Sequence, residues 1–327
     1  MRILQDSTIL VMIYLIAGAG LFVAVGLCGQ VSINQAVFLG VGAIFSSYFG
    51  RSTLDGGLSM PFTTTIILSA LCTSFIGVIF AYLTHKMRSD QAISASIASA
   101  VLIMYIFEKL EFISGGSRGV SSAKSIEFLG LDFTNLKVGS HIFDPKISLI
   151  ILYSFFAIIV IFLTFNISRS KLALAFRYMR QRDLAAQVCA INPTKTILQA
   201  HLISSFFAGL AGALYAYHLG SIELTSQNPW LGSFGIIVSL QILAFISIGG
   251  LRKLKSTLIG AALLVTIGGG VTAFITNLDL VNSKNETLLS TSQINVLVSS
   301  VLVLISLHIY SRRASFRSLK SIINKKN

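Results

Sequence analysis

Eight long stretches of the chain contain no lysine, arginine, aspartate or glutamate, and this pattern constrains the fold more than any other feature. Together they make up 216 of the 327 residues. Seven of them are 17 to 30 residues long and the first is 44 residues long. A helix needs about 20 apolar residues to cross a bilayer. The eight stretches are 7–50, 56–85, 91–107, 147–168, 196–222, 224–251, 256–278 and 287–311.

The overall composition also indicates a membrane-spanning chain. It is 54% hydrophobic and 11% charged, whereas a soluble domain has about 25% charged residues. This excludes an ordinary soluble enzyme, a nucleic-acid-binding module and a disordered chain. Because the apolar stretches are continuous rather than alternating, they favour helices over a β-barrel. We expect an all-α integral membrane protein, a polytopic bundle of about eight or nine transmembrane segments in a single domain, 1–327.

The charges between the apolar stretches predict the side of the membrane on which each connection lies. Alternate connections carry a net charge of +15, whereas the others carry −2. Lysine and arginine are enriched in cytoplasmic connections. The positive-inside rule therefore predicts a cytoplasmic C-terminus and an external loop at 108–146. The positive connections are 86–90, 169–195, 252–255 and the basic tail 312–327.

The first apolar stretch, 7–50, leaves two topologies open. Its middle part, 26–43, contains four glycines and a group of polar residues. An interrupted segment is tolerated in a membrane only against protein or along a water-lined path. The segment is therefore either a broken helix on a translocation path or a tight turn between two plain spans. Two crossings would place the N-terminus outside, and one would place it inside. The residues concerned are Gly29, Gln30, Ser32, Asn34 and Gln35.

The chain shows no arrangement typical of catalysis, metal binding or ion coupling. Ion-coupled carriers usually need ionisable groups within the membrane, and the apolar stretches contain no carboxylate, lysine or arginine. For the histidines His201 and His218 we expect structural hydrogen bonding. Cys28, Cys72 and Cys189 form no CxxC pair, so they predict neither a disulfide nor a metal site. We expect no catalytic residue, no metal and no cofactor bound by this chain.

The connection 169–195 is the most informative segment outside the apolar stretches. Residues Arg177 to Asn192 predict a short helix that ends before Pro193. Such a helix docks into the groove of a partner protein or rests on anionic lipid, and the residues alone do not distinguish these alternatives. Its apolar face would contain Leu184, Val188 and Ile191, and a different, polar face would contain Arg180, Asp183 and Gln187.

The predicted external loop, 108–146, contains a glycine-rich sequence, ISGGSRGVSS, at 113–122. Its glycines, Gly115, Gly116 and Gly119, permit backbone conformations that other residues rarely adopt. A loop of this length is often functional. It is either a landing surface for an external partner or a flexible turn.

Six stretches, in order, resemble the permease subunits of ATP-binding-cassette importers for branched-chain amino acids, specifically the LivM type. They span roughly residues 10–305, which is most of the chain. The stretches are GLCGQVSINQAVFLGVGA at 26–43, ISGGSRGV at 113–120, RDLAAQVCAIN at 182–192, SSFFAGLAGALYAYHLGSI at 204–222, LQILAFISIGGL at 240–251 and LIGAALLV at 258–265.

The resemblance implies a multi-pass subunit of the cell inner membrane, surrounded by lipid and with no nucleic acid partner. It implies a second permease subunit of LivH type, two ATPase subunits that bind ATP and Mg, and a periplasmic substrate-binding protein. The chain itself would be no enzyme, and it would translocate branched-chain or related hydrophobic amino acids by alternating access. The alternatives are urea or short-chain amides as substrates, an ion-coupled secondary transporter, and a non-transporting scaffold.

The resemblance also implies that 180–192 is the loop that couples the permease to its ATPases. Asp183 takes the acidic position and Ala185 with Ala186 the paired alanines. Two departures from the family pattern are visible. Ala190 replaces a glycine, which predicts a continued helix, and Arg252, Lys253 and Lys255 replace a glycine-rich turn with proline. The coupling residues would be Arg180, Asp183, Leu184, Ala185, Ala186, Val188, Ile191 and Asn192.

Overall fold

The structure is a computed structural model, and most of the described residues form long helices. Several sequence predictions fall on Asp183, Leu184, Ala185, Arg252, Lys253 and the tail 312–327, which lie outside the described residues. The structure describes residues 2–53, 56–87, 89–116, 119–121, 126–128, 131–133, 137–138, 141–142, 145–181, 186, 188–222, 234–249, 254–262, 266 and 301.

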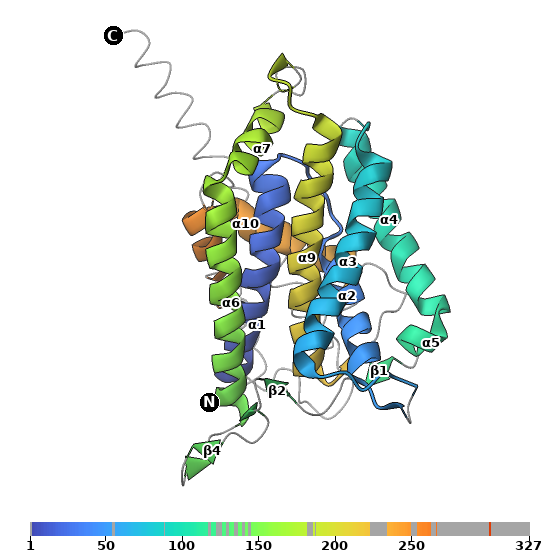
Figure 1. Ribbon diagram of the computed structural model, residues 1–327, viewed down its shortest axis with the longest axis vertical. Helices are drawn as coiled ribbons and strands as arrows, with labels where there is room; N and C mark the ends of the chain where they lie inside the picture. Colours follow the sequence, from blue (N-terminus) through green and yellow to red (C-terminus); the bar gives the residue numbers. More distant parts are fainter. Residues whose placement is uncertain are drawn as a thin grey trace.

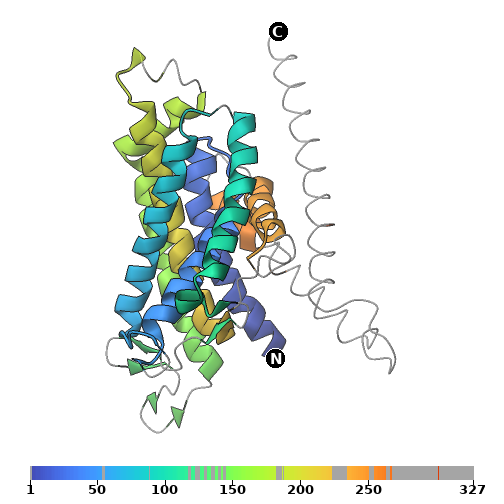
Figure 2. The ribbon, with the colours of Figure 1, turned by 90° about the vertical axis from the view of Figure 1, so that its right-hand side faces the viewer.

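Among the described residues, six apolar helices of 16 residues or more form the bundle (Figures 1 and 2). They are α1 (Arg2–Leu21), α2 (Gln35–Gly50), α3 (Phe62–Thr84), α4 (Ser89–Lys109), α6 (Pro145–Arg169) and α9 (Pro193–Leu219). In the described part of the chain, five helical segments are long and apolar enough to cross a membrane, and α2 is apolar but shorter. The helical membrane fold is confirmed, while eight or nine segments remain a prediction.

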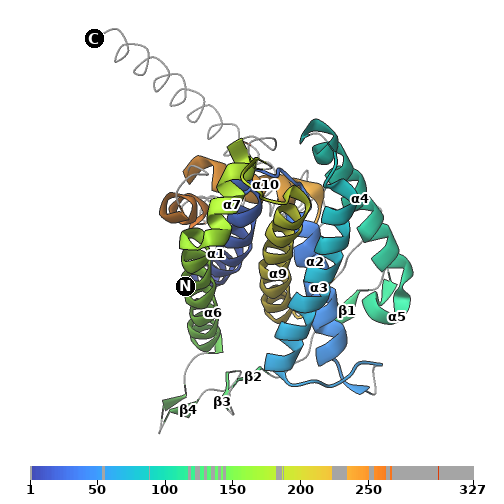
Figure 3. The same ribbon diagram turned by 45° about the horizontal axis from the view of Figure 1, so that its top comes forward.

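Shorter helices lie between these six or follow them. They are the π-helix η1 (Phe22–Leu27), α5 (Glu111–Ser114), α7 (Lys171–Gln181) and α10 (Ile236–Gly249). Three short antiparallel strand pairs also occur: β1 (Val120–Ser121) with β6 (Ser221–Ile222), β2 (Glu127–Phe128) with β3 (Leu131–Asp132), and β4 (Lys137–Val138) with β5 (His141–Ile142). The strand pairs lie at the end of the bundle opposite α7 (Figures 1 and 3).

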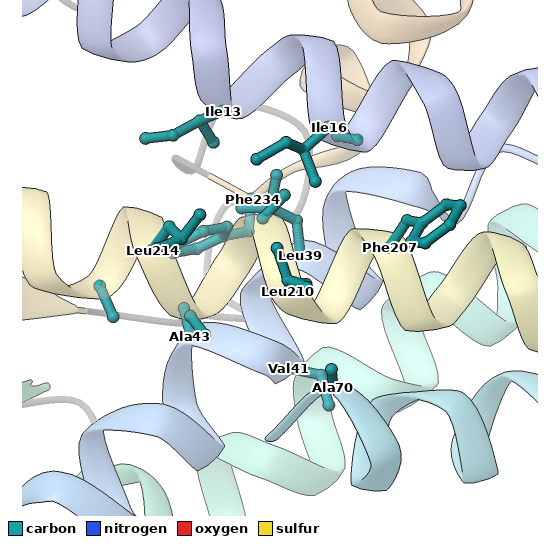
Figure 4. Packing of buried hydrophobic residues seen from close by; sticks show 14 of the residues in the cluster. Ile13, Ile16, Leu39, Val41, Ala43, Ala70, Phe207, Leu210, Leu214 and Phe234 are labelled. Atoms are coloured by element: carbon teal, nitrogen blue, oxygen red, sulfur yellow. The ribbon is translucent and has the colours of Figure 1, made fainter. Parts of the chain in front are cut away.

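Helix α9 lies at the centre of the bundle and packs against α1, α2 and α3. Side chains of α1 and α2, such as Ile16 and Leu39, gather with Leu214 of α9 in one buried cluster (Figure 4). Glycines bring the helix backbones close together. A Cβ atom on Gly212 would lie 1.9 Å from the carbonyl oxygen of Leu39, so only glycine fits there. Small residues of this kind are typical of helix contacts in membranes.

The outer helices α3, α4 and α6 expose large apolar side chains to the surroundings. Phe75 and Leu83 of α3 and Ile158 and Phe162 of α6 are all more than half exposed. A soluble chain rarely carries such extended apolar faces, whereas lipid tails cover them at no cost. The outer surface therefore agrees with a multi-pass membrane protein.

Two contacts place the starts of α1 and α3 at the same end of the bundle. Lys146 at the start of α6 pairs with Asp6 near the start of α1, with 2.7 Å between Nζ and the carboxylate. Phe62 at the start of α3 packs on Tyr217 near the end of α9, with ring centroids 4.8 Å apart. Both contacts lie at the end of the bundle that carries the strand pairs (Figure 1). Helix α1 therefore runs from this end of the bundle toward α7, and α2 runs back toward the strand pairs. This geometry favours the two-crossing topology for 7–50.

Candidate functional site

The turn between α1 and α2 is an irregular segment inside the bundle. Helix α1 continues into η1, where the N–H of Cys28 donates to the carbonyl of Val23 at 3.2 Å and the N–H of Gln30 donates to that of Ala24 at 3.0 Å. Gly29 then takes a left-handed conformation with φ +79°. Wide π-helical turns are frequent at functional sites. We call residues 28–34 the break.

Gln35 links three helices just after the break. Its side chain is 1% exposed. The Nε2 group donates to the carbonyl oxygen of Ala17 in α1 at 2.8 Å. The hydroxyl of Ser204 in α9 donates to its Oε1 at 3.2 Å. An amide with both donor and acceptor satisfied is well suited to a buried position.

Serine hydroxyls surround the start of α2, whose first N–H groups need partners because no helical turn precedes them. The N–H of Ile33 donates to Ser96 Oγ of α4 and that of Ala36 donates to Ser239 Oγ of α10, each at 3.0 Å. Asn34 Nδ2 donates to Ser99 Oγ at 2.9 Å. We call the following residues the polar cluster: Asn34, Gln35, Ser96, Ser99, Ser204 and Ser239.

The polar cluster offers neutral dipoles within an apolar bundle. Asn34 is fully buried, and its Oδ1 atom has no hydrogen-bond partner among the described residues. An unsatisfied buried acceptor costs about 1–3 kcal/mol. Ser32 is also buried, whereas Gln30 is half-buried. His201, also on α9, is buried and packs edge-on against Phe80. The arrangement suits polar groups of an uncharged or zwitterionic solute.

The predicted coupling helix 177–192 ends before Ile191. Within the described residues, α7 extends to Gln181 and helical geometry is present at Ala186 and Val188, before a turn at Cys189 and Ala190. Ala190 has φ +58°, and the N–H of Ile191 donates to the carbonyl of Ala186 at 3.1 Å. This bond pattern with a left-handed residue is a Schellman-type helix end. The expectation that Ala190 continues the helix is therefore wrong.

The next residues start α9. The side chain of Asn192 accepts a hydrogen bond from the N–H of Lys195 at 3.3 Å, and Pro193 occupies the first helical position. Asparagine as N-cap and proline in the first turn are favourable for a helix start. Asn192 therefore fixes the direction in which the chain enters the bundle.

The two apolar residues of the predicted docking face that the structure describes point in different directions. Val188 is 89% exposed. Ile191 is partly buried and, with Ala186, packs in a cluster that includes Phe176 of α7 and Leu254. These two residues therefore do not share one apolar face, because the turn at Ala190 rotates Ile191 toward the bundle. Of the two, Val188 points outward.

Arg180 contacts the break. Its Nη1 atom donates a hydrogen bond to the carbonyl oxygen of Gly26 in η1. A Cβ atom on Gly29 would lie 2.8 Å from Cγ of Arg180. The bonded residues are 154 positions apart. The sequence instead predicted that Arg180 lies on the polar face of a docking helix. Neither the spacing nor the residue types signal this pairing.

The glycine-rich sequence of the predicted external loop folds onto the end of α9. Gly115, Gly116 and Gly119 have φ of +68°, +63° and +71°. Gly115 ends α5, and a Cβ atom there would lie 2.3 Å from the carbonyl oxygen of Gly119. The next residues form β1, which pairs with β6 directly after Gly220. The glycines therefore shape a defined connection.

The comparison with known proteins decides the family. The sequence profile of the family described as "Branched-chain amino acid transport system / permease component" matches residues 3–307. The chain belongs to this family. The resemblance found in the sequence is thereby confirmed, and the matched residues include the break, the polar cluster and the segment 180–192.

Two curated relatives have the same description, "High-affinity branched-chain amino acid transport system permease protein LivM". The protein of Salmonella typhimurium (strain LT2) is 27% identical and that of Escherichia coli (strain K12) is 26% identical, each over 277 residues. These residues are 80% of this chain, and the chain spans 61% of the length of either relative. No solved structure matches the chain.

Proposed function

We propose that the chain is a transmembrane permease subunit of an ATP-binding-cassette importer that translocates branched-chain or related hydrophobic amino acids. The match to the permease family over residues 3–307 is the observation that carries the proposal. The printed names of the LivM relatives favour amino acids over urea or short-chain amides. ATP and Mg would bind to two partner ATPase subunits, and a second permease subunit and a periplasmic binding protein would complete the importer.

The absence of fixed charge from the apolar stretches favours this importer over an ion-coupled carrier. A carrier driven by an ion gradient needs a titratable or charged group in the membrane, and the eight stretches contain no carboxylate, lysine or arginine. An importer takes its free energy from hydrolysis elsewhere and needs no such group. Its substrate must nevertheless be desolvated during passage.

The composition of the polar cluster supports a role for this cluster in the passage of the substrate. The ammonium and carboxylate groups of an amino acid need dipoles when they leave water, and the start of α2 supplies N–H groups with a positive partial charge. Amide and hydroxyl groups of Asn34, Gln35 and the neighbouring serines supply further donors and acceptors. The apolar side chain of the substrate suits the surrounding aliphatic residues.

The loop after α7 supports coupling to an ATPase subunit. Residues 169–195 carry a net charge of +5, which predicts the cytoplasmic side. Val188 projects from this loop almost fully exposed, and the turn at Ala190 fixes the base of the loop. An exposed apolar side chain on a short, fixed loop fits a groove of a partner protein. Movement of the ATPases would reach the permease through this contact.

The test is transport by the complete complex in proteoliposomes. We expect uptake of leucine, isoleucine or valine only when the ATPase side has ATP and the binding protein is present on the other side. Replacement of the Walker A lysine of the ATPase subunits is the matched control, and it should abolish uptake without loss of the complex. Uptake driven by an imposed ion gradient without ATP would overturn the proposal. Transport of urea but of no amino acid would overturn the substrate class.

A further inference from the structure

The side chain of Arg180 links the end of α7 to the end of η1. Its guanidinium donates to the carbonyl oxygen of Gly26. This carbonyl lies in the last turn of η1, where the helix stops and the following turn supplies few donors. A hydrogen bond from a charged donor is stronger than one between neutral groups. The pairing therefore holds the last turn of η1 to α7.

A second contact at the same place does not depend on the guanidinium. A Cβ atom on Gly29 would lie 2.8 Å from Cγ and 3.2 Å from Cβ of Arg180, and 3.3 Å from its Cα. The backbone of the break therefore lies directly on the base of the Arg180 side chain. The left-handed φ of +79° at Gly29 sets this approach. A larger residue at 29 would push α7 and the break apart.

Apolar packing joins the same two elements along the rest of α7. Phe176 and Met179 are buried in one cluster with Phe22, Leu27 and Cys28. The cluster also contains Ala186 of the loop after α7. Close-packed groups transmit displacement because they have little room to deform. The loop, α7 and the first residues of the break therefore form one packed unit.

The break leads directly to the polar cluster. Four residues after Gly29, Ile33 makes the first hydrogen bond to α4 and Asn34 makes a second. Gln35 then adds hydrogen bonds to α1 and α9. A displacement of Gly26 and Gly29 therefore reaches the start of α2 through a short length of chain. We infer that Arg180 is a positioning residue that transmits movement of the coupling loop to the break, and so to the polar cluster. This inference rests on the proposed function.

The first test compares two arginines of α7. Arg177 also donates to a backbone carbonyl, that of Ser168 at 3.0 Å, but this bond is local to the connection between α6 and α7. R177A is therefore the matched control for R180A. The readouts are the amount of ATPase subunit that co-purifies and the number of leucine molecules transported per ATP hydrolysed, both in the complete complex.

We expect R180A to keep its ATPase subunits and to lose transport per ATP by about tenfold or more, the factor that corresponds to one charge-assisted hydrogen bond. R180K should regain part of this loss because its ammonium also donates. R177A should stay close to the unmodified complex. If Arg180 only stabilised the fold, R180A would lower the yield of the complex, its transport and its ATP hydrolysis together. The number of leucine molecules transported per ATP hydrolysed would then stay unchanged.

The second test compares two glycines with similar backbones. Gly29 and Gly220 have φ of +79° and +74°, so alanine is strained at both. Within the described residues no atom lies within 4 Å of a Cβ on Gly220, whereas Arg180 lies within 3 Å of one on Gly29. G29A should lower transport per ATP, and G220A should not. The difference between the two variants in transport per ATP measures the effect of the contact with Arg180 separately from the effect of backbone strain.

Three outcomes would overturn the inference. R180A and G29A could transport as many molecules per ATP as the unmodified complex. R180A could release the ATPase subunits, which would mean that Arg180 binds the partner. G29A and G220A could show equal losses. Failure of the unmodified complex to transport amino acids with ATP would instead refute the proposed function, so the two failures are distinguishable.

Discussion

Gln35 of α2 accepts a hydrogen bond of 3.2 Å from Ser204 of α9, although 169 residues separate them. The same amide donates to the carbonyl of Ala17 in α1. Three helices therefore meet at one neutral side chain, where the chain becomes helical again after the break. This position combines an irregular stretch of backbone with hydrogen bonds to three other helices. A solute that displaces one of these bonds would shift the others.

Replacing Gln35 by leucine should weaken both stability and transport. Q35L removes the donor to the carbonyl of Ala17 and leaves the hydroxyl of Ser204 without its acceptor. We expect a loss of about 1–3 kcal/mol in stability for these lost hydrogen bonds. If the polar cluster meets the substrate, the KM for leucine should also rise. Thermal unfolding of the purified complex and uptake in proteoliposomes measure the two effects.

Gln30 provides the control for Q35L. It lies in the break, five residues before Gln35, but is half-buried, so Q30L should cost less in unfolding temperature. Equal changes in KM for Q30L and Q35L would contradict a specific role of the polar cluster.

Replacing Val188 by aspartate should detach the ATPase subunits. The side chain is 89% exposed, so the substitution has little effect on the folding of this chain, but it places a charge in the proposed docking groove. Interface anchors commonly cost 2 kcal/mol or more when removed, and roughly 30-fold weaker binding follows. Co-purification of tagged permease with its ATPases is the measurement.

Leu174 is the matched control because it is also an exposed apolar residue, on α7 rather than on the loop. L174D should leave co-purification unchanged. Retention of the ATPases by V188D would show that this loop does not dock through Val188.

Charge placement and apolar length predicted the helical bundle because both follow from the cost of burying charge in lipid. They also located the irregular segment in 7–50, since glycines and polar side chains there depart from the surrounding composition. Charge placement and composition could not predict which residues that segment contacts. Asn34 and Gln35 bond to Ser99 and Ser204, and serines of this kind occur throughout the apolar stretches without any periodic signal.

The predicted coupling segment, 180–192, shows a different limit of prediction from sequence. Its helical periodicity grouped Val188 with Ile191, but one left-handed residue, Ala190, rotates them apart. An alanine does not predict this left-handed conformation, because alanine is the strongest helix former. The glycine of the family pattern at this position was the only available signal, and it indicated the turn that the structure contains.

Replacing Ala190 by glycine should stabilise the loop. An alanine with φ +58° carries a cost of about 1 kcal/mol relative to an allowed conformation, and glycine avoids it. A190G should therefore raise the thermal unfolding midpoint of the complex, and A190V should lower it. The same substitution at Ala186, which is helical and buried, should destabilise by roughly 0.5–1 kcal/mol. Equal shifts for A190G and A186G would contradict the left-handed assignment.

Adding a methyl group where α9 meets α2 should disrupt the bundle. A Cβ on Gly212 would lie 1.9 Å from the carbonyl oxygen of Leu39, and one on Gly42 would lie 2.4 Å from the carbonyl oxygen of Gly209. Both neighbours are backbone atoms, which cannot rotate away as a side chain can. We expect G212A and G42A each to cost about 3 kcal/mol or more, seen as lower yield and a lower unfolding temperature.

The control for this prediction is A98V, which adds bulk on an exposed position of α4. It should leave the unfolding temperature almost unchanged, because the added methyl groups point away from the bundle. If G212A unfolded at the same temperature as the unmodified protein, the close approach of α2 and α9 would be wrong. Since α9 also carries Ser204, a bundle loosened at Gly212 should lose its hydrogen bond to Gln35, so G212A should impair uptake more than its stability loss alone explains.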